Sequence, residues 1–201
     1  MKDDSFLSLK GRSEGLFKAK GSKHFGFAVP VKSEDEVKVF LGLIRKEHPT
    51  ARHHCYAYRL GHDAAISKST DDGEPSNSAG PPILGVLRSN NLTNSLVVVV
   101  RYFGGTKLGV GGLIEAYREA GKAAVDTGDI ITCIRTNTFK IIYPYSKMGE
   151  VMTILKRVNI SPENTDFQLT CSLDATIRLK DSDAFENQIS SIDEVKVKLC
   201  L

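Results

Sequence analysis

The longest uninterrupted apolar run in the chain is the five residues Leu96–Val100, and it limits the possible folds more than any other feature. A membrane-spanning helix needs about twenty apolar residues, so this run is too short to form one. We expect instead a strand over Asn94–Phe103. Because its apolar character hardly alternates, both faces of the sheet should be covered at this strand. The sequence therefore predicts a layered domain built around it.

A glycine-rich segment follows the predicted strand and leads into a helix. Glycines this dense allow sharp turns and close approaches of the backbone. One apolar stripe indicates the helix, which should end near Gly128. The glycines are Gly104, Gly105, Gly109, Gly111 and Gly112, and the stripe is Leu113, Ala116, Tyr117, Ala120 and Ala124.

Shorter patterns predict the elements that precede this strand. Ser33 and Glu36 have the spacing of a capping box, which indicates a helix that starts there and stops at Pro49. The apolar stripe of that helix would pack on a sheet. The remaining patterns predict strands over Gly15–Lys20, Lys23–Val31, His54–Arg59 and Ala64–Ser69, the last two paired, and a short helix around Ile83–Leu87.

The last third of the chain has a different pattern, in which long alternations are separated by two helical stripes. The order is β-α-β-β-α-β, the split ferredoxin-like pattern. We therefore predict two domains of the α+β class, residues 1–134 and residues 135–201. The strands are expected around Phe139–Tyr143, Ile160–Asp166, Leu169–Leu179 and Val195–Leu201, and the helices around Met148–Leu155 and Phe185–Ile192.

Composition narrows the class of protein. The formal net charge of +3 is too small to indicate nucleic-acid binding by itself, although residues 1–130 carry the whole excess, with 18 basic and 15 acidic side chains. The polar N-terminus lacks the apolar segment of a secretory signal, so we expect a cytoplasmic protein. The four cysteines lack the paired spacing of a zinc site, and no metal or cofactor is predicted.

The glycine-rich segment is the sharpest candidate for a binding site. Its backbone N–H groups could converge on a phosphate, and Arg101 and Lys107 would add full positive charges. Tyr102 and Phe103 could stack on bases, or they could end the strand by packing into the core. The segment matches neither a P-loop nor a dinucleotide fingerprint. The glycines could equally serve only a tight crossing from strand to helix.

An acidic cluster upstream, Asp71, Asp72 and Glu74, is a second candidate. With His53 and His54 it could bind a metal, but no known ligand spacing connects these residues. We favour a helix cap together with an ion pair to one of the two cations of the glycine-rich segment.

The other nucleophiles and histidines are expected to be structural. Ser76 or Ser78 fits a helix N-cap, and Cys55 fits a packed thiol. The three remaining histidines, His24, His48 and His62, fit surface or helix-end positions.

The order of these motifs resembles the YigZ/IMPACT family. The resemblance implies an N-terminal domain like domain 2 of ribosomal protein S5 and a ferredoxin-like tail similar to the last domain of elongation factor G. Asn77 replaces a glycine found in many members. Only about 14 residues precede the matching block, so we expect a bacterial-type member without the RWD domain of the eukaryotic relatives, and their regulation of translation initiation is not transferred. The matching residues are Asp71-Asp72-Gly73-Glu74-Pro75, Ala79-Gly80, Pro82-Ile83, Arg101-Tyr102-Phe103-Gly104-Gly105, Leu108-Gly109, Gly111-Gly112-Leu113 and Ala116-Tyr117, with His48-Pro49, His53 and Cys55 to Arg59 upstream.

Both implied fold types recur in translation and RNA-binding proteins, so the resemblance implies RNA or the ribosome as partner, with a translation-related protein as a further one. Neither a membrane partner nor sequence-specific DNA binding is expected. An enzyme acting on a phosphorylated small molecule and a protein-interaction module built on the tail's sheet remain alternatives. The residues expected to bind nucleic acid or phosphate are Arg101, Tyr102, Phe103, Gly104, Gly105, Lys107, Gly109, Gly111 and Gly112, and those expected to orient the loop are Asp72, Glu74 and His53.

Overall fold

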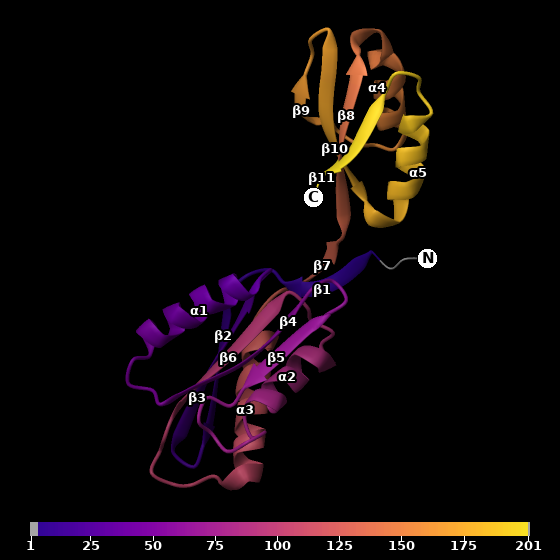
Figure 1. Cartoon of the computed structure of the whole chain (residues 1–201). Coiled ribbons are helices and arrows are strands. Elements are labelled where there is room, and N and C mark those ends of the chain that lie inside the picture. The colour runs from indigo at the N-terminus through magenta and orange to yellow at the C-terminus, as the bar shows by residue number, and fades with distance from the viewer. Residues whose placement is uncertain (1–3, 201) are drawn as a thin grey trace. The chain divides into compact units, whose positions relative to one another are not determined.

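The computed structural model describes residues 4–200 and divides into two compact units (Figure 1). The N-terminal unit is Phe6–Cys133. The C-terminal unit begins at Ile134 and also includes Asp4 and Ser5. The two-domain α+β class expected from the sequence is confirmed.

The N-terminal unit is built on a five-stranded antiparallel sheet with the strand order β2-β3-β6-β4-β5. All five strands were expected, and β4 and β5 pair as predicted. The strands are β2 (Ser13–Ala19), β3 (Ser22–Pro30), β4 (His53–Leu60), β5 (Ile66–Thr70) and β6 (Ser95–Tyr102), and the helices are α1 (Glu34–Glu47), α2 (Gly80–Ser89) and α3 (Gly109–Asp126).

Strand β6 lies at the centre of this sheet and is covered on both faces. Val97 and Val99 belong to a core that α2 and α3 close, whereas Leu96, Val98 and Val100 belong to a core that α1 closes. The prediction of two covered faces is confirmed. The arrangement is antiparallel, so a near-continuous apolar run does not require parallel neighbours.

Helix α1 begins and ends where the sequence predicts. The Ser33 hydroxyl accepts a hydrogen bond from the Glu36 backbone N–H at 3.2 Å, as an N-cap does. The stripe that was expected to pack on the sheet is buried, and the helix ends at Glu47, two residues before Pro49.

A two-stranded sheet of β1 (Ser5–Leu9) and β7 (Ile130–Ile134) was not predicted. Leu9 is buried in the core that α2 and α3 close, and the Thr93 N–H donates to the Leu7 carbonyl at 3.0 Å. The short apolar segments at these positions carry too few alternations to distinguish a strand from a loop.

The C-terminal unit has the predicted β-α-β-β-α-β order and the strand order β11-β8-β10-β9. Its core lies between one face of the sheet and the two helices. None of the helices within residues 4–200 is both long and apolar enough to cross a membrane. The elements are β8 (Thr136–Pro144), a 3-10 turn η1 (Tyr145–Lys147), α4 (Met148–Arg157), β9 (Glu163–Asp166), β10 (Thr170–Arg178), α5 (Leu179–Ser190) and β11 (Lys196–Cys200).

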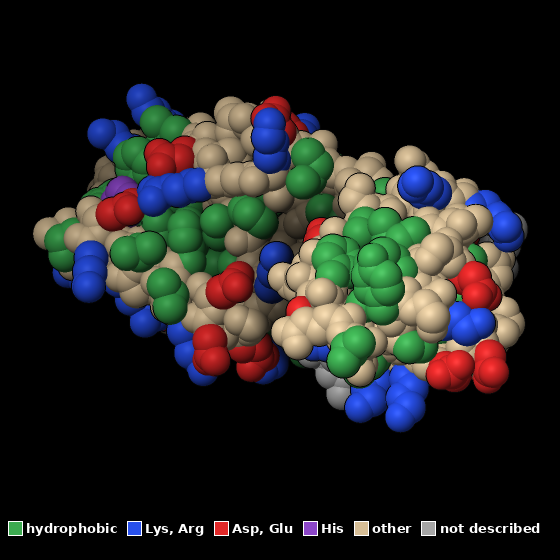
Figure 2. Space-filling view, turned by 90° about the horizontal axis from the view of Figure 1, so that it is seen from above, with side chains coloured by type: hydrophobic (Ala, Val, Ile, Leu, Met, Phe, Trp, Pro, Cys, Tyr) green, Lys and Arg blue, Asp and Glu red, His purple; other side chains and the backbone are tan. Residues whose placement is uncertain are grey.

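Large apolar side chains also lie on the surface of both units. Figure 2 shows apolar side chains between charged ones on one face of the molecule. Val39 on α1 is 66% exposed and Leu169, just before β10, is 92% exposed. Most of a protein's accessible surface comes from apolar atoms, so single exposed residues of this kind do not by themselves mark a binding site.

Candidate phosphate-binding pocket

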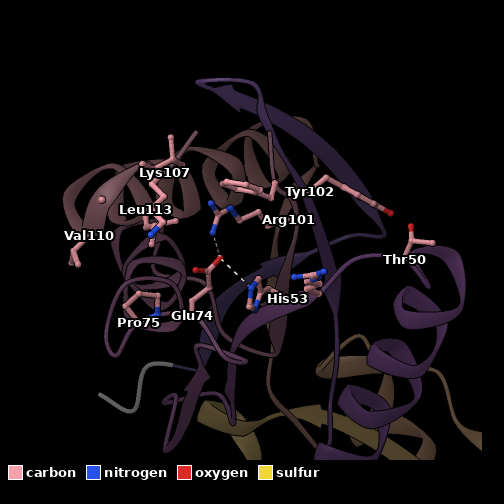
Figure 3. Close-up of a pocket in the computed structure, with 13 residues that line it drawn as sticks. Thr50, His53, Glu74, Pro75, Arg101, Tyr102, Lys107, Val110 and Leu113 are labelled. Carbon is pink, nitrogen blue, oxygen red and sulfur yellow. Dashed lines mark hydrogen bonds and ion pairs between the residues drawn. The ribbon is translucent and has the colours of Figure 1, made fainter. Parts of the chain in front are cut away.

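A pocket of about 710 Å³ opens where β6 ends and α3 begins (Figure 3). It collects residues from three separate parts of the N-terminal unit: the α1–β4 loop with the start of β4, the loop before α2, and the segment from β6 into α3. Its lining is Thr50, Arg52, His53, Glu74, Pro75, Arg101, Tyr102, Phe103, Lys107, Leu108, Gly109, Val110 and Leu113.

Arg101 forms the wall of this pocket together with Glu74. Its Nη1 donates to Glu74 Oε1 at 2.6 Å, and the two side chains are 9% and 4% exposed. The Tyr117 hydroxyl donates to the same oxygen at 2.8 Å. Burial raises the pKa of Tyr117 above its usual value, so this hydroxyl stays protonated and remains a donor. Most of the charge on Arg101 is therefore neutralised inside the protein.

The loop that carries Glu74 is held by Asp71. The Asp71 carboxylate accepts hydrogen bonds from the backbone N–H groups of Asn77, Ala79 and Gly80 at 2.8–2.9 Å. It therefore caps the start of α2 from eight residues upstream. The expectation that Ser76 or Ser78 caps this helix is wrong, because the Ser78 hydroxyl donates instead to the Pro75 carbonyl.

Asp72 does not pair with either cation of the glycine-rich segment, contrary to the expectation. Its carboxylate accepts from the His54 backbone N–H at 2.7 Å and lies 3.9 Å from Arg45. The Asp72 carbonyl instead accepts from His53 Nδ1 at 2.8 Å. A carbonyl can only accept, so the proton sits on Nδ1 and leaves Nε2 of His53 facing Glu74 Oε1 at 4.0 Å. Within residues 4–200 no three potential ligands lie close enough to hold a metal ion.

Cys55 is a packed thiol, as expected. It is fully buried, its Sγ donates to the Asp71 carbonyl at 2.9 Å, and burial raises its pKa. Because the thiolate is the reactive form, Cys55 is not poised as a nucleophile.

The glycines of this segment differ in what requires them. A Cβ on Gly104 would lie 1.9 Å from the backbone carbon of Gly21, so Gly104 is required by the close approach of the β2–β3 turn. Gly105 and Gly109 have positive φ values of 89° and 75°. A Cβ on Gly111 would meet nothing within 4 Å. Gly109, Gly111 and Gly112 were expected in a loop, but they form the first turn of α3.

The first turn of α3 is open to a ligand. The described chain offers no side-chain cap at Leu108 and no acidic residue in this turn. The first N–H groups of a helix have no intrahelical partner and carry a partial positive charge. Lys107 and Arg52 are exposed at the same pocket, and neither makes an ion pair with any residue of the described chain.

Tyr102 and Phe103 differ in what they can contact. Tyr102 lies on the α1 face, where its hydroxyl and His48 Nδ1 are 2.9 Å apart and its ring meets Phe25 edge-on. Phe103 is 60% exposed, with the Arg101 guanidinium 5.6 Å from its ring centroid. Of the two, Phe103 is the aromatic surface available for stacking, and Tyr102 is held by its own neighbours.

His24 does not line the pocket but lies beside Arg101, a position that the sequence analysis missed. It was expected at the surface, but it is fully buried on β3, directly opposite Arg101 in the sheet. Its ring meets Tyr117 edge-on, and among the described residues neither ring nitrogen has a hydrogen-bond partner. The alternation along β3, with His24, Gly26 and Ala28 on one face, was the signal that could have found it.

Burial and the neighbouring Arg101 lower the pKa of His24 from 6.5 to about 4. The unfolded chain therefore binds one more proton than the folded chain between pH 6.5 and pH 4, and stability is lost as the pH falls through this range. As the pH falls through this range, the free energy of unfolding of His24→Leu should therefore decrease by up to about 3 kcal/mol less than that of the wild type. Urea unfolding at a series of pH values measures the difference. Burial also lowers the pKa of His54, which titrates in both proteins, so His24→Leu should keep part of the pH dependence. A pH dependence as large as that of the wild type would rule out this role for His24.

Comparison with known proteins places these features in one family. The model of the Impact N-terminal domain matches residues 20–125. The IMPACT family member YvyE of Bacillus subtilis is 30% identical over 195 residues, which cover 96% of this chain and 88% of that protein. The IMPACT family member YigZ of Escherichia coli is 45% identical over 85 residues, 41% of this chain and 42% of that protein. A crystal structure of a hypothetical protein aligns over 98% of both chains, with a TM-score of 0.72 and 26% identity.

Proposed function

The chain belongs to the IMPACT family, and from that premise we propose that it binds RNA or the ribosome in a role linked to translation. The observation that carries the proposal is the pocket at the start of α3. A helix N-terminus without a side-chain cap, two exposed cations without ion pairs within residues 4–200, and an exposed aromatic ring meet there. These are the groups that bind single-stranded nucleic acid: donors and cations for phosphate, and an aromatic platform for a base.

The phosphate would lie at the first turn of α3. The N–H groups of Gly109–Gly111 supply donors there, and Lys107 and Arg52 supply the charge. Among the described residues that line the pocket, Glu74 is the one acidic residue, and its carboxylate is already paired with Arg101. Repulsion of the ligand by this carboxylate is thereby reduced.

The role of Arg101 in this proposal differs from a direct phosphate contact. Because Glu74 largely neutralises the charge of Arg101, the main contribution of Arg101 is to fix the loop that carries Glu74 and to support the ring of Phe103. Lys107 and Arg52 are consequently the better residues for testing phosphate contacts, since neither side chain is part of the buried network.

The same pocket supports a second candidate, a phosphorylated small molecule. Its volume of about 710 Å³ lies within the range of small-molecule sites. A thermal-shift panel of phosphorylated metabolites separates the two proposals, because a ligand of the folded state must raise its stability. Stabilisation by a metabolite, together with no affinity for RNA, would favour the second candidate.

We expect Phe103→Ala to weaken binding of a fluorescein-labelled single-stranded RNA by about 1–3 kcal/mol per lost stacked base. Lys107→Gln should weaken it by removing one phosphate contact. Fluorescence anisotropy at low salt measures both. Matched controls are Val39→Ala, an equally exposed apolar residue on α1, and Lys122→Gln, an exposed lysine further along α3. Equal effects of test and control variants would place the RNA elsewhere.

A further inference from the structure

The sheet of the C-terminal unit has one face that its own helices do not cover. The buried side chains of β8 and β10 pack against α4 and α5, and Figure 1 shows both helices on one side of the sheet. The alternate residues of each strand point to the opposite side, which we call the outer sheet face. In the middle of β8 and β10 these are Thr138, Lys140 and Ile142, and Ser172, Asp174 and Thr176. Arg178, at the end of β10, follows the same alternation, and its charge is paired with Asp4.

Positive and negative side chains occupy different halves of the outer sheet face. Lys198 on β11 lies opposite Lys140 on β8. On the other side of β8, Lys140 lies opposite Asp174 on β10. Asp174 in turn lies opposite Glu163. The β11–β8 half therefore holds the three lysines Lys140, Lys196 and Lys198, and the β10–β9 half holds the three carboxylates Glu163, Asp166 and Asp174.

These charges lack ion-pair partners within residues 4–200, although Asp174 accepts one hydrogen bond from Asn164. Two lysines directly opposite each other on neighbouring strands repel. Neighbouring carboxylates on the other half repel in the same way. A partner that presents the opposite order of charges would relieve both halves at once.

We propose that the outer sheet face binds a second copy of this chain, face to face. A two-fold axis parallel to the strands turns the copy so that its β9 lies over β11 of the first chain, and its β11 over β9. Both basic halves then meet acidic halves, and the same contacts occur twice, as an isologous interface requires. A two-fold axis across the strands would instead place lysines on lysines. RNA does not fit the face as a whole, because half of it is acidic.

The interface is expected to be weak and salt-sensitive, because the face is polar and only one unit's sheet contributes to it. Sedimentation equilibrium of the full chain at about 50 mM salt should show reversible dimers, and the dissociation constant should rise about tenfold or more at about 500 mM salt. A chain that stays monomeric at up to about 1 mM protein and low salt overturns the proposal.

Charge reversal on the two edge strands tests the geometry. We expect Lys196→Glu with Lys198→Glu to abolish the dimer, and Glu163→Lys with Asp166→Lys to do the same. All four residues are exposed. An equimolar mixture of the two variants should form a heterodimer about as tight as the wild-type dimer, since every contact is again between opposite charges.

Lys156→Glu with Arg157→Glu is the matched control. Both residues are exposed on α4, which covers the other face of the sheet, and the change in net charge equals that of the lysine variant. The control should dimerise like the wild type. Loss of association in only one of the two reversed variants, or no heterodimer on mixing, would contradict a two-fold contact through this face.

Discussion

Replacing Arg101 with leucine is expected to lower the free energy of unfolding of the N-terminal unit by about 3–5 kcal/mol. Among the described residues, the substitution leaves the Glu74 carboxylate, 4% exposed, with the Tyr117 hydroxyl and a distant His53 nitrogen as partners. A buried charge without its counter-ion retains its desolvation cost and loses the attraction that offset it. Urea unfolding followed by circular dichroism measures the loss.

A double-mutant cycle separates this effect from simple loss of packing. Glu74→Leu alone should also be strongly destabilising, because it leaves the buried guanidinium of Arg101 without its counter-ion. The variant with both substitutions should lose much less than the sum of the two, because no unpaired charge remains. Additive losses would show that the ion pair is not what the fold depends on at this position.

The second large effect is expected at Gly104. Gly104→Ala should cost about 1–3 kcal/mol, because its Cβ would overlap the backbone of Gly21 and push the β2–β3 turn away from β6. The clash is with backbone atoms, so no side-chain rotation relieves it. The hydrogen bond from the Gly104 N–H to the Ser22 hydroxyl, at 3.1 Å, would also be strained.

Gly111→Ala is the matched comparison within the same segment. Its Cβ meets nothing within 4 Å and its backbone is helical, so alanine should stabilise α3 by about 0.5–1 kcal/mol. Thermal unfolding of the two variants should shift in opposite directions. A stability loss of similar size in both would mean that the segment acts as a single packed turn, without an open first turn of α3.

The elements of both units could be predicted wherever a pattern repeats often enough. β10 alternates over its whole length, and the α1 stripe is bounded by Ser33 and Pro49, so both were located correctly. The β1–β7 pair was missed because strands of five residues are too short for a clear periodic signal, and the burial along β1 does not alternate. A periodic pattern depends on neighbouring residues, whereas the pairing of β1 with β7 joins residues more than a hundred positions apart.

The candidate pocket was predicted less completely than the fold. The residues of the glycine-rich segment were identified, but which aromatic ring is exposed depends on where β6 ends. Tyr102 is its last residue and packs against its neighbours, whereas Phe103 follows the strand and is exposed. The pairing of Arg101 with Glu74 was among the expected options. The Asp71 cap is a local contact, but its spacing of eight residues matches no standard capping motif. The burial of His24 could have been predicted from the alternation along β3, which was not applied to it.

The measurement that tests the proposed function most directly is the salt dependence of RNA binding. Phosphate contacts predict that log K falls linearly with log[salt], with a slope of about −0.7 per contact for a single strand. We expect a clear negative slope for the wild type. The variant with Lys107→Gln and Arg52→Gln should be folded and should show a slope smaller in magnitude by about 1.4. No RNA binding at any salt concentration, or a slope that the two substitutions leave unchanged, would contradict a phosphate site at the start of α3.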